Sequence, residues 1–219
     1  MQSTYLYYPQ PELPRIFVYG LWVALFAATF YLDQQINTKV ALLFFVCVVI
    51  IAYAIKHYVY GQNLGFTLTA THFQQHLYKG GWVLQWHNIR SINTLEYDFH
   101  GWQTSIPWVG IAIKDYQAFL QQISPKVMTQ MLLHQRNLLY LGLKQHGRQA
   151  EFEDLLIKDT PFYFPDGTQV KGLQAMFANR MAVQKQLWGY DLFISEGDIV
   201  GKKSDFVGLA RRYLAASHS

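Results

Sequence analysis

Two nearly uncharged stretches lie near the N-terminus of the chain, and the sequence that follows them is much more polar. Residues 16–60 contain only three charged side chains, Asp33, Lys39 and Lys56. From residue 61 onward the sequence has the ordinary mixture of charges expected of a hydrated surface. The composition therefore changes near Gly61. With 219 residues, the chain has room for roughly one or two domains.

The two apolar stretches, residues 16–32 and 40–60, predict a hairpin of transmembrane helices. Helices of about 17 to 21 residues rise roughly 26 to 31 Å, which matches a hydrocarbon core of about 30 Å. Lys56 can extend its ammonium group to the interface, and tyrosines stand near the ends of both segments. The alternatives are buried helices of a soluble protein or a cleaved signal peptide. Two apolar segments in succession, and a leader without a basic region, argue against both.

Lysine and arginine residues near the apolar segments predict the orientation of the hairpin. Arg15 and Lys56 flank its outer ends, whereas Lys39 lies in the short connection close to Asp33. Because positively charged residues next to a membrane segment favour the cytoplasmic side, we expect both termini in the cytoplasm. We therefore predict a multi-pass protein located in the inner (cell) membrane. The lipid bilayer is the first partner that we expect.

Beyond the hairpin, apolar and polar residues alternate with the period of two that is typical of β-strands. A turn signal, Lys79-Gly80-Gly81, separates two of these runs. The pattern predicts an antiparallel meander of four or five strands, built from Phe66–Ala70, Phe73–Tyr78, Trp82–Trp86, Ile92–Phe99 and Trp108–Ile113.

A helical period follows the meander. Apolar side chains from Tyr116 to Ile123 recur at helical spacing behind Asp115, which can cap the helix, and Ser124-Pro125 stops it. A meander closed by one helix, just after a membrane hairpin, resembles the bacterial pleckstrin-homology-like (PH-like) domains of small membrane proteins. The segments Phe66-Thr-Leu-Thr-Ala-Thr-His-Phe73 and Trp86-His-Asn-Ile89-Arg-Ser-Ile92 carry the resemblance. The whole chain is similar to uncharacterised bacterial two-helix membrane proteins with such a domain, and the resemblance implies no activity.

The remainder of the chain is predicted to be mostly helical. Expected helices span Val127–His146, Gly172–Trp188 and Ser204–Leu214, with a turn at Pro165-Asp166-Gly167 and a strand at Tyr190–Ile194. The last strand and helix repeat the order of the meander's end, so a duplicated unit is an open alternative. The predicted fold is a membrane-anchored α+β protein. Its predicted parts are a tail and hairpin (1–60), a PH-like domain (61–125) and a helical region packed on that domain (126–219).

Charge and motifs exclude several function classes. The net charge is +4, but the basic residues are scattered among acids, which argues against nucleic-acid binding. No nucleotide-binding, hydrolase or zinc motif is present, so we expect no catalytic, cofactor or metal site. His72 and His76 lie on a predicted strand, which separates them by roughly 13 Å and makes them surface or boundary residues rather than metal ligands.

Arg180 is the most informative charged residue. On a helical wheel it falls inside the apolar arc of the 172–188 helix, whereas Ala175, Ala178 and Ala182 lie opposite. A buried guanidinium needs a negative partner. We expect an internal ion pair with one of four nearby acids, and anion binding is the alternative. The candidate carboxylates are Glu151, Glu153, Asp154 and Asp166.

A second basic group stands near the C-terminus. Lys202, Lys203, Arg211 and Arg212 either form the solvated side of the closing helix or contact anionic lipid headgroups.

Two functions remain open. The first is a membrane-confined binding or scaffolding module without catalytic activity, whose partner is an anionic lipid headgroup or another membrane protein. Its sign would be a groove or sheet edge without clustered titratable residues. The second is an enzyme of lipid or envelope metabolism, recognisable by a polar pocket that collects Arg180, acids and histidines.

Overall fold

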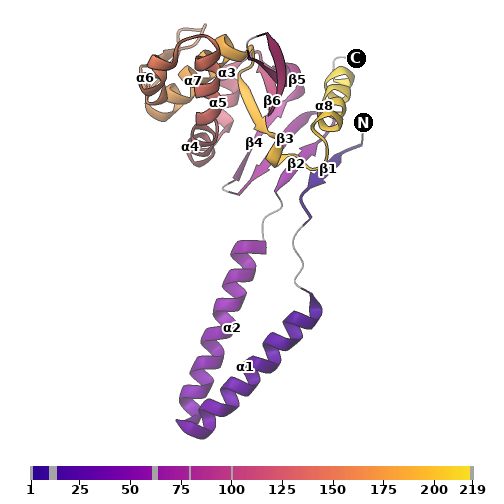
Figure 1. Cartoon of the computed structure of the whole chain (residues 1–219), viewed down its shortest axis with the longest axis vertical. Coiled ribbons are helices and arrows are strands. Elements are labelled where there is room, and N and C mark those ends of the chain that lie inside the picture. Colours follow the sequence, from indigo (N-terminus) through magenta and orange to yellow (C-terminus); the bar gives the residue numbers. More distant parts are fainter. Residues whose placement is uncertain (1, 10–13, 61–63, 79, 100, 218–219) are drawn as a thin grey trace. The chain divides into compact units, whose positions relative to one another are not determined.

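The computed structural model of the chain describes residues 2–9, 14–60, 64–78, 80–99 and 101–217, without the side chains of residues 15, 55–60 and 99. These residues form two compact units. One is a helical hairpin within residues 9–63, and the other joins the residues up to Tyr8 to those from Leu64 onward (Figure 1). The protein is therefore a mixed α+β chain in which a helical hairpin is inserted near the start of a larger domain.

The hairpin consists of α1 (Arg15–Gln35) and α2 (Thr38–Tyr60), which confirms the two helices predicted there. The helices contact each other through Phe26 and Phe45, whose ring centroids are 5.6 Å apart. Leu25 and Ala41 are the buried hydrophobic residues of this unit among those described. The side chain of Lys56, predicted to reach a membrane interface, lies outside the described residues.

The first sheet of the domain has four antiparallel strands in the order β1-β2-β3-β4. Three of them confirm predicted strands, whereas β1 was not predicted from the tyrosine-rich leader. Gly65 has a φ of +147°, and a Cβ atom there would lie 2.0 Å from the carbonyl oxygen of Leu6, so a glycine is required where β2 meets β1. The strands are β1 (Thr4–Tyr7), β2 (Gly65–Leu68), β3 (His72–Leu77) and β4 (Gly80–Gln85).

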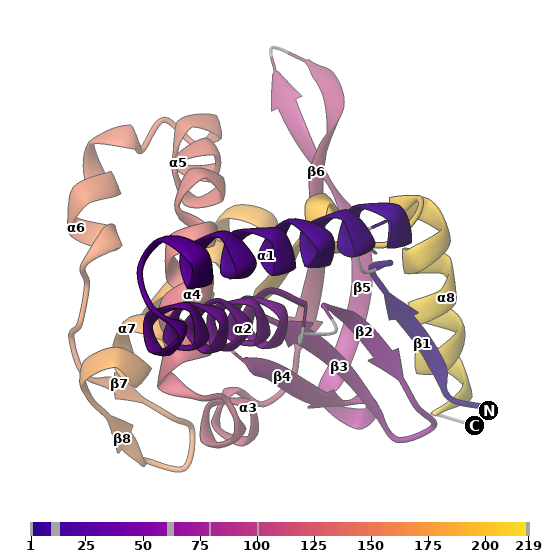
Figure 2. The same ribbon diagram turned by 90° about the horizontal axis from the view of Figure 1, so that it is seen from below.

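The second sheet combines a long local hairpin with a strand from far along the chain. After a short 3-10 turn, η1 (Trp86–Asn88), β5 (Ile89–Phe99) pairs with β6 (Trp102–Ile113), and β6 pairs in turn with β9 (Leu192–Ser195). Figure 2 shows the far end of the β5–β6 hairpin projecting beyond the rest of the domain. The strand predicted at Tyr190–Ile194 is thus part of this sheet.

Helices fill the chain between β6 and β9. Asp115 caps α3 by accepting hydrogen bonds from the amides of Gln117 (2.8 Å) and Ala118 (3.4 Å), as the sequence predicts. Ser124 and Pro125 end α3 and also begin the next helix, because serine caps its first turn and proline fits its first position. The elements are α3 (Tyr116–Gln122), α4 (Pro125–His134), α5 (Arg136–Gln145), η2 (Gln149–Glu151), α6 (Phe152–Leu156), β7 (Phe162–Tyr163), β8 (Gln169–Val170) and α7 (Gly172–Trp188).

The single helix predicted over Val127–His146 is wrong in one respect, because it is broken at Gln135. This residue ends α4 and precedes α5. Its buried side chain donates a hydrogen bond to the carbonyl oxygen of Phe193 at 3.3 Å. The break therefore directs a polar side chain from the helices to the second sheet. The β7–β8 hairpin contains the turn predicted at Pro165-Asp166-Gly167.

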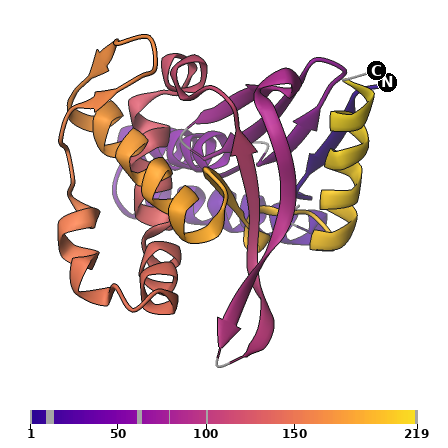
Figure 3. The same cartoon turned by 90° about the horizontal axis from the view of Figure 1, so that it is seen from above.

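The hydrophobic core lies between the two sheets, the helices and α8 (Lys203–Ala216), the last helix (Figure 3, yellow). Trp86 and Tyr213 stack with their ring centroids 5.8 Å apart, which fixes α8 to the first 3-10 turn. Tyr213 also donates a hydrogen bond to the carbonyl oxygen of Gln2 at 2.5 Å. The core is rich in aromatic residues, which include Phe66, Phe73, Trp82, Trp86, Phe119, Phe177 and Phe206.

The units differ from the predicted parts 1–60, 61–125 and 126–219. The leader strand β1 belongs to the domain because it pairs with β2, and residues on both sides of 125 form one unit because β9 completes the second sheet. The helix predicted to close the meander, α3, packs on β4 and α7, whereas α8 packs on β5. The last strand and helix therefore complete the domain.

Candidate functional site

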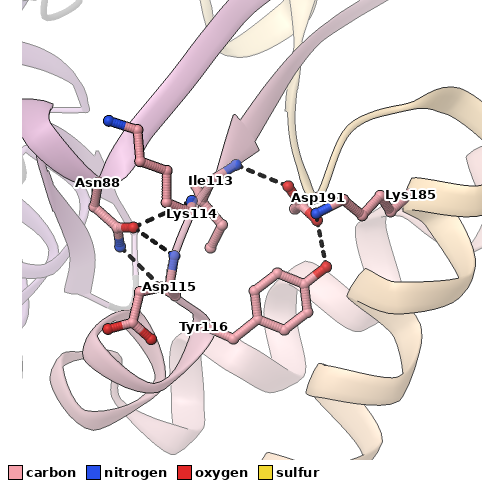
Figure 4. Close-up of polar contacts among 7 residues, drawn as sticks. All are labelled: Asn88, Ile113, Lys114, Asp115, Tyr116, Lys185 and Asp191. Carbon is pink, nitrogen blue, oxygen red and sulfur yellow. Dashed lines mark hydrogen bonds and ion pairs between the residues drawn. The ribbon is translucent and has the colours of Figure 1, made fainter. Parts of the chain in front are cut away.

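A buried carboxylate, Asp191, stands where the helices rejoin the second sheet (Figure 4). It accepts a hydrogen bond from the amide of Ile113 at 2.7 Å and another from the hydroxyl group of Tyr116. The ammonium group of Lys185 lies 3.2 Å from Oδ1, the same oxygen that accepts from Tyr116, and 5.5 Å from the centre of the Tyr116 ring. The contacts join the end of β6, the start of α3, α7 and the residue before β9 in one network.

The chemistry of this network is structural. Burial, followed by the hydrogen bond and the charge of Asp191, raises the pKa of the Tyr116 hydroxyl, so the phenol keeps its proton at neutral pH. The carboxylate of Asp191 is thus bound by the phenol of Tyr116, the ammonium group of Lys185 and the amide of Ile113. Asp191 therefore has a structural role: it holds these elements together, because its oxygens are already bound to donors of the protein.

The side-chain amide of Asn88 supports the same connection between β6 and α3. The side-chain oxygen of Asn88 accepts hydrogen bonds from the amides of Lys114 (3.2 Å) and Asp115 (2.7 Å), and its nitrogen donates to the carbonyl oxygen of Asp115 (2.9 Å). The chain between β6 and α3 is thus held from both sides, by Asn88 and by Asp191 (Figure 4).

A polar pocket, partly open to solvent, lies between β3, α4 and the second sheet. Its enclosed volume is about 20 Å³, which is room for about one water molecule. Polar side chains come from distant positions: Gln75 from β3, Gln130 and His134 from α4, and Asp198 from η3 (Glu196–Asp198). Apolar side chains and two further polar groups complete the lining, namely Leu77, Trp108, Met131, Gln135, Phe193 and Ser195.

Asp198 is the acidic group of this pocket. Burial raises the pKa of its carboxyl, and the nearby charge of His134 and a hydrogen bond from Gln75 oppose that shift. The donor is the Gln75 amide nitrogen, 3.3 Å from the carboxylate. Gln130 has a buried side-chain oxygen without a hydrogen-bond partner among the described residues. The pocket therefore offers the carboxylate of Asp198 to a ligand that brings hydrogen-bond donors.

Sequence reasoning did not find this pocket. Its polar residues are spread from Gln75 to Asp198, and they meet only because β3, α4 and β9 are brought together by the fold. The only signal in the sequence is the presence of three glutamines, Gln75, Gln130 and Gln135, on predicted strand and helix positions near apolar residues. This pattern is too weak to indicate a site.

Arg180 is buried as predicted, with 3 % of its surface exposed, but the expected ion pair is wrong. Among the described residues it pairs with none of the four proposed acids, and its Nη2 instead donates to the carbonyl oxygens of Leu155 (3.4 Å) and Leu156 (3.0 Å). The opposite face of α7 also differs from the prediction. Ala175 and Ala178 are fully buried because α3, α4, α5 and β7 all pack on this helix.

The four C-terminal basic residues do not form a uniform patch. Lys203 donates to the carbonyl oxygen of Ile106 at 2.6 Å and lies 3.3 Å from the carboxylate of Glu196. The Nε of Arg211 donates to the carbonyl oxygen of Ile92 at 2.8 Å and so attaches α8 to β5. Lys202 and Arg212 are exposed. Lys203 and Arg211 therefore bind backbone carbonyl groups of the domain, although Arg211 is exposed like Lys202 and Arg212.

The histidines at positions 72 and 76 lie on β3, as predicted. His72 hydrogen-bonds to threonine hydroxyl groups of the neighbouring turn, and His76 lies 2.9 Å from the hydroxyl oxygen of Thr67. Within the part of the chain that the structure describes, no group of three metal-ligating side chains gathers.

The role of Asp191 can be tested by removing its carboxylate. Asp191→Ala leaves the Ile113 amide and the Tyr116 hydroxyl buried without their acceptor, so we expect the free energy of unfolding to fall by about 3 to 5 kcal/mol. Denaturant unfolding of the detergent-solubilised chain, followed by tryptophan fluorescence, measures this loss. Asp98→Ala, which removes an exposed acid near the end of β5 and its hydrogen bond from the amide of Gly101, is the control and should cause a smaller loss. An equal loss of unfolding free energy in the two variants would contradict the structural role of Asp191.

The raised pKa of Asp198 predicts a pH-dependent stability. Because the folded state holds this proton more tightly than the unfolded state, the favourable contribution is present below the ordinary carboxyl pKa and is lost as pH rises. Asp198→Asn keeps an oxygen for Gln75 but cannot ionise. Its melting temperature should exceed that of the native chain at neutral pH, and the difference should shrink towards about pH 4. A constant difference would contradict this prediction.

Comparison with known protein families gives a match over most of the domain. Residues 66–216 match a family described as protein of unknown function (DUF2982), a range that runs from β2 to the last residue of α8. No curated protein and no solved structure matches the chain. Since the match covers more than half of the sequence, the chain belongs to the DUF2982 family of proteins of unknown function.

Proposed function

We propose that the protein is a membrane-confined binding module without catalytic activity. Its hairpin crosses the inner membrane, and its domain binds part of another membrane protein. The observation that carries the proposal is the uncovered apolar surface of the hairpin, where Ile16 is 86 %, Phe30 66 % and Tyr53 69 % exposed. An apolar surface of this extent needs a membrane or a protein to cover it.

The lengths of the helices support the bilayer as the cover. In α1, the stretch Ile16–Gln35 is long and apolar enough to span a membrane. The part of α2 with described side chains, Thr38–Ala54, is apolar but shorter, and the helix itself continues to Tyr60. At 1.5 Å per residue, the 23 residues of α2 rise roughly 34 Å. Both helices are thus compatible with a hydrocarbon core of about 30 Å.

The arrangement of the sheets supports a PH-like domain. A four-stranded and a three-stranded antiparallel sheet are followed by the C-terminal helix α8. In this interpretation the hairpin is an insertion between β1 and β2, and the segment from α3 to α7 is an insertion between β6 and β9. The PH-like part is then larger than residues 61–125, and its closing helix is α8.

The polar pocket favours binding over catalysis. Gln75, Gln130 and Gln135 line it, and a glutamine side chain forms hydrogen bonds but does not exchange protons at neutral pH. The acceptors of the pocket and the charge of Asp198 suit a lysine, arginine or amide side chain better than an anionic headgroup. The enclosed volume of about 20 Å³ is room for about one water molecule, so the pocket takes at most the polar end of one side chain.

An enzyme remains the alternative, and one observation favours it. Asp198, an acid whose pKa is raised by burial, shares the pocket with His134. The alternative site around Arg180 has less support, since the described residues show no carboxylate bound to that guanidinium.

Removal of the hairpin tests the anchor. The amide of Tyr8 donates to the carbonyl oxygen of Leu64 at 3.0 Å, so an Asn-Gly turn can join these two residues in place of residues 9–63. We expect the full chain in the membrane fraction, released by detergent and not by alkaline carbonate. The closed variant should be soluble and should unfold cooperatively. Truncation to residues 64–217 is the matched comparison and should be less stable, because it also removes β1. A full chain that is soluble without detergent would overturn the anchor.

The orientation needs a separate measurement. We expect both termini in the cytoplasm, because Arg15 and Lys56 flank the outer ends of the hairpin. Reporters of cytoplasmic and periplasmic exposure, fused after Ser219 in two separate fusion proteins, should give only the cytoplasmic signal. A periplasmic signal alone would reverse the orientation and place the partner outside the cytoplasm.

A further inference from the structure

The guanidinium group of Arg180 is a buried charge without a counter-charge among the described residues. Its Nε and Nη1 atoms have no hydrogen-bond partner, and Nη2 binds only two backbone carbonyl oxygens. Burial lowers the pKa of the side chain to about 10, so it stays protonated at neutral pH. A buried cation that lacks a negative partner is unfavourable by several kcal/mol. The position is therefore one at which an anion would be strongly stabilised.

Gln184 extends this polar surface by one helical turn. It is fully buried, and neither atom of its side-chain amide has a partner among the described residues. Residues four apart lie on the same face of a helix, so Arg180 and Gln184 share one face of α7. On the next turn, the indole nitrogen of Trp188 is also buried without a partner among the described residues, but the backbone of Gly142 covers it so closely that a Cβ atom there would lie 2.6 Å away. The donors that remain for a ligand are those of Arg180 and Gln184.

The segment over Arg180 is attached through partly buried side chains, among them Phe152 and Leu155, which pack on core residues of α5 and α7. Neither η2 nor α6 contains a buried residue, and Ile157, the residue after α6, is 71 % exposed. The carbonyl oxygens of Leu155 and Leu156, at the end of α6, are the groups that bind Arg180. A segment without a fully buried side chain opens at a lower cost in free energy than the core does. Displacement of these two carbonyl groups would uncover the guanidinium.

We propose that the Arg180–Gln184 face of α7 is a binding site for an oxyanion of the phosphate type, which enters by displacing the end of α6. The planar guanidinium can form two parallel hydrogen bonds to two phosphate oxygens, and the amide nitrogen of Gln184 supplies a third donor. A negative charge there neutralises Arg180, which the two carbonyl dipoles do not. The source is either free phosphate or the headgroup of an anionic phospholipid, and the two share this chemistry.

A phosphate titration of the detergent-solubilised full chain tests the site. We expect the melting temperature to rise and saturate with inorganic phosphate but not with chloride at equal ionic strength. Amide exchange in residues 149–157 should become faster with phosphate, as the end of α6 is displaced. Gln184→Leu should weaken the apparent affinity about tenfold, through loss of one hydrogen bond to a charged group.

Arg180→Met is the deciding variant, because it removes the charge and keeps an unbranched side chain. Without phosphate it should be at least as stable as the native chain, since an uncompensated buried cation is gone. It should lose the response to phosphate. Arg212→Met, which removes an exposed arginine of α8, is the matched control and should keep the response. A response retained by Arg180→Met would overturn the site.

Nanodiscs distinguish the two sources. If the headgroup is the ligand, the native chain melts at a higher temperature in discs containing phosphatidylglycerol than in discs of phosphatidylcholine, and Arg180→Met abolishes the difference. If free phosphate is the ligand, only added phosphate has this effect. No response to either would overturn the proposal. The headgroup arm rests on the proposed anchor, whereas the phosphate titration does not, so failure to enter nanodiscs would contradict the anchor alone.

Discussion

The domain depends on the network around Asp191. The chain leaves the second sheet after β6, builds a series of helices and a small hairpin, and must return to the same sheet with β9. The return is fixed by one carboxylate that binds the end of β6, the first residue of α3 and a lysine of α7. Because this carboxylate is fully buried, its charge is tolerated only where all three donors are in place. The network therefore couples correct pairing of β9 to correct placement of the helices.

Local patterns in the sequence predicted most of the elements, because helical and extended periods are properties of short segments. The pairing of β9 with β6 could not be predicted in this way, since it joins residues about eighty positions apart and depends on the intervening helices. The strand β1 was missed because tyrosines in an N-terminal leader match a membrane interface as well as a sheet. Ser124-Pro125 shows a further ambiguity, since the same pair ends one helix and begins the next.

The candidate sites show the same division. Burial of Arg180 follows from its place on a helical wheel, which is local information. The partner of Arg180 could not be predicted in the same way, because the positions of the expected acids depend on tertiary packing. In the structure, two backbone carbonyl oxygens bind the guanidinium instead. Lys203 and Arg211 appeared to be surface cations, yet they reach across to β6 and β5, contacts that no helical wheel includes. The glutamines of the pocket are separated too widely in the sequence to suggest a common site.

The insertion of the hairpin between β1 and β2 has a mechanical consequence. Both of its connections meet the domain at one hydrogen-bonded pair, Tyr8 and Leu64, at the end of a two-strand ladder. A force that separates the two connections would load the ladder from this end and break its hydrogen bonds one after another, as in unzipping. The hydroxyl group of Tyr8 binds the carbonyl oxygens of Gly197 and Ile199, so the first step of such a separation would also pull on the segment between β9 and α8. Relative movement of the two helices would thereby be transmitted to the wall of the pocket that contains Asp198.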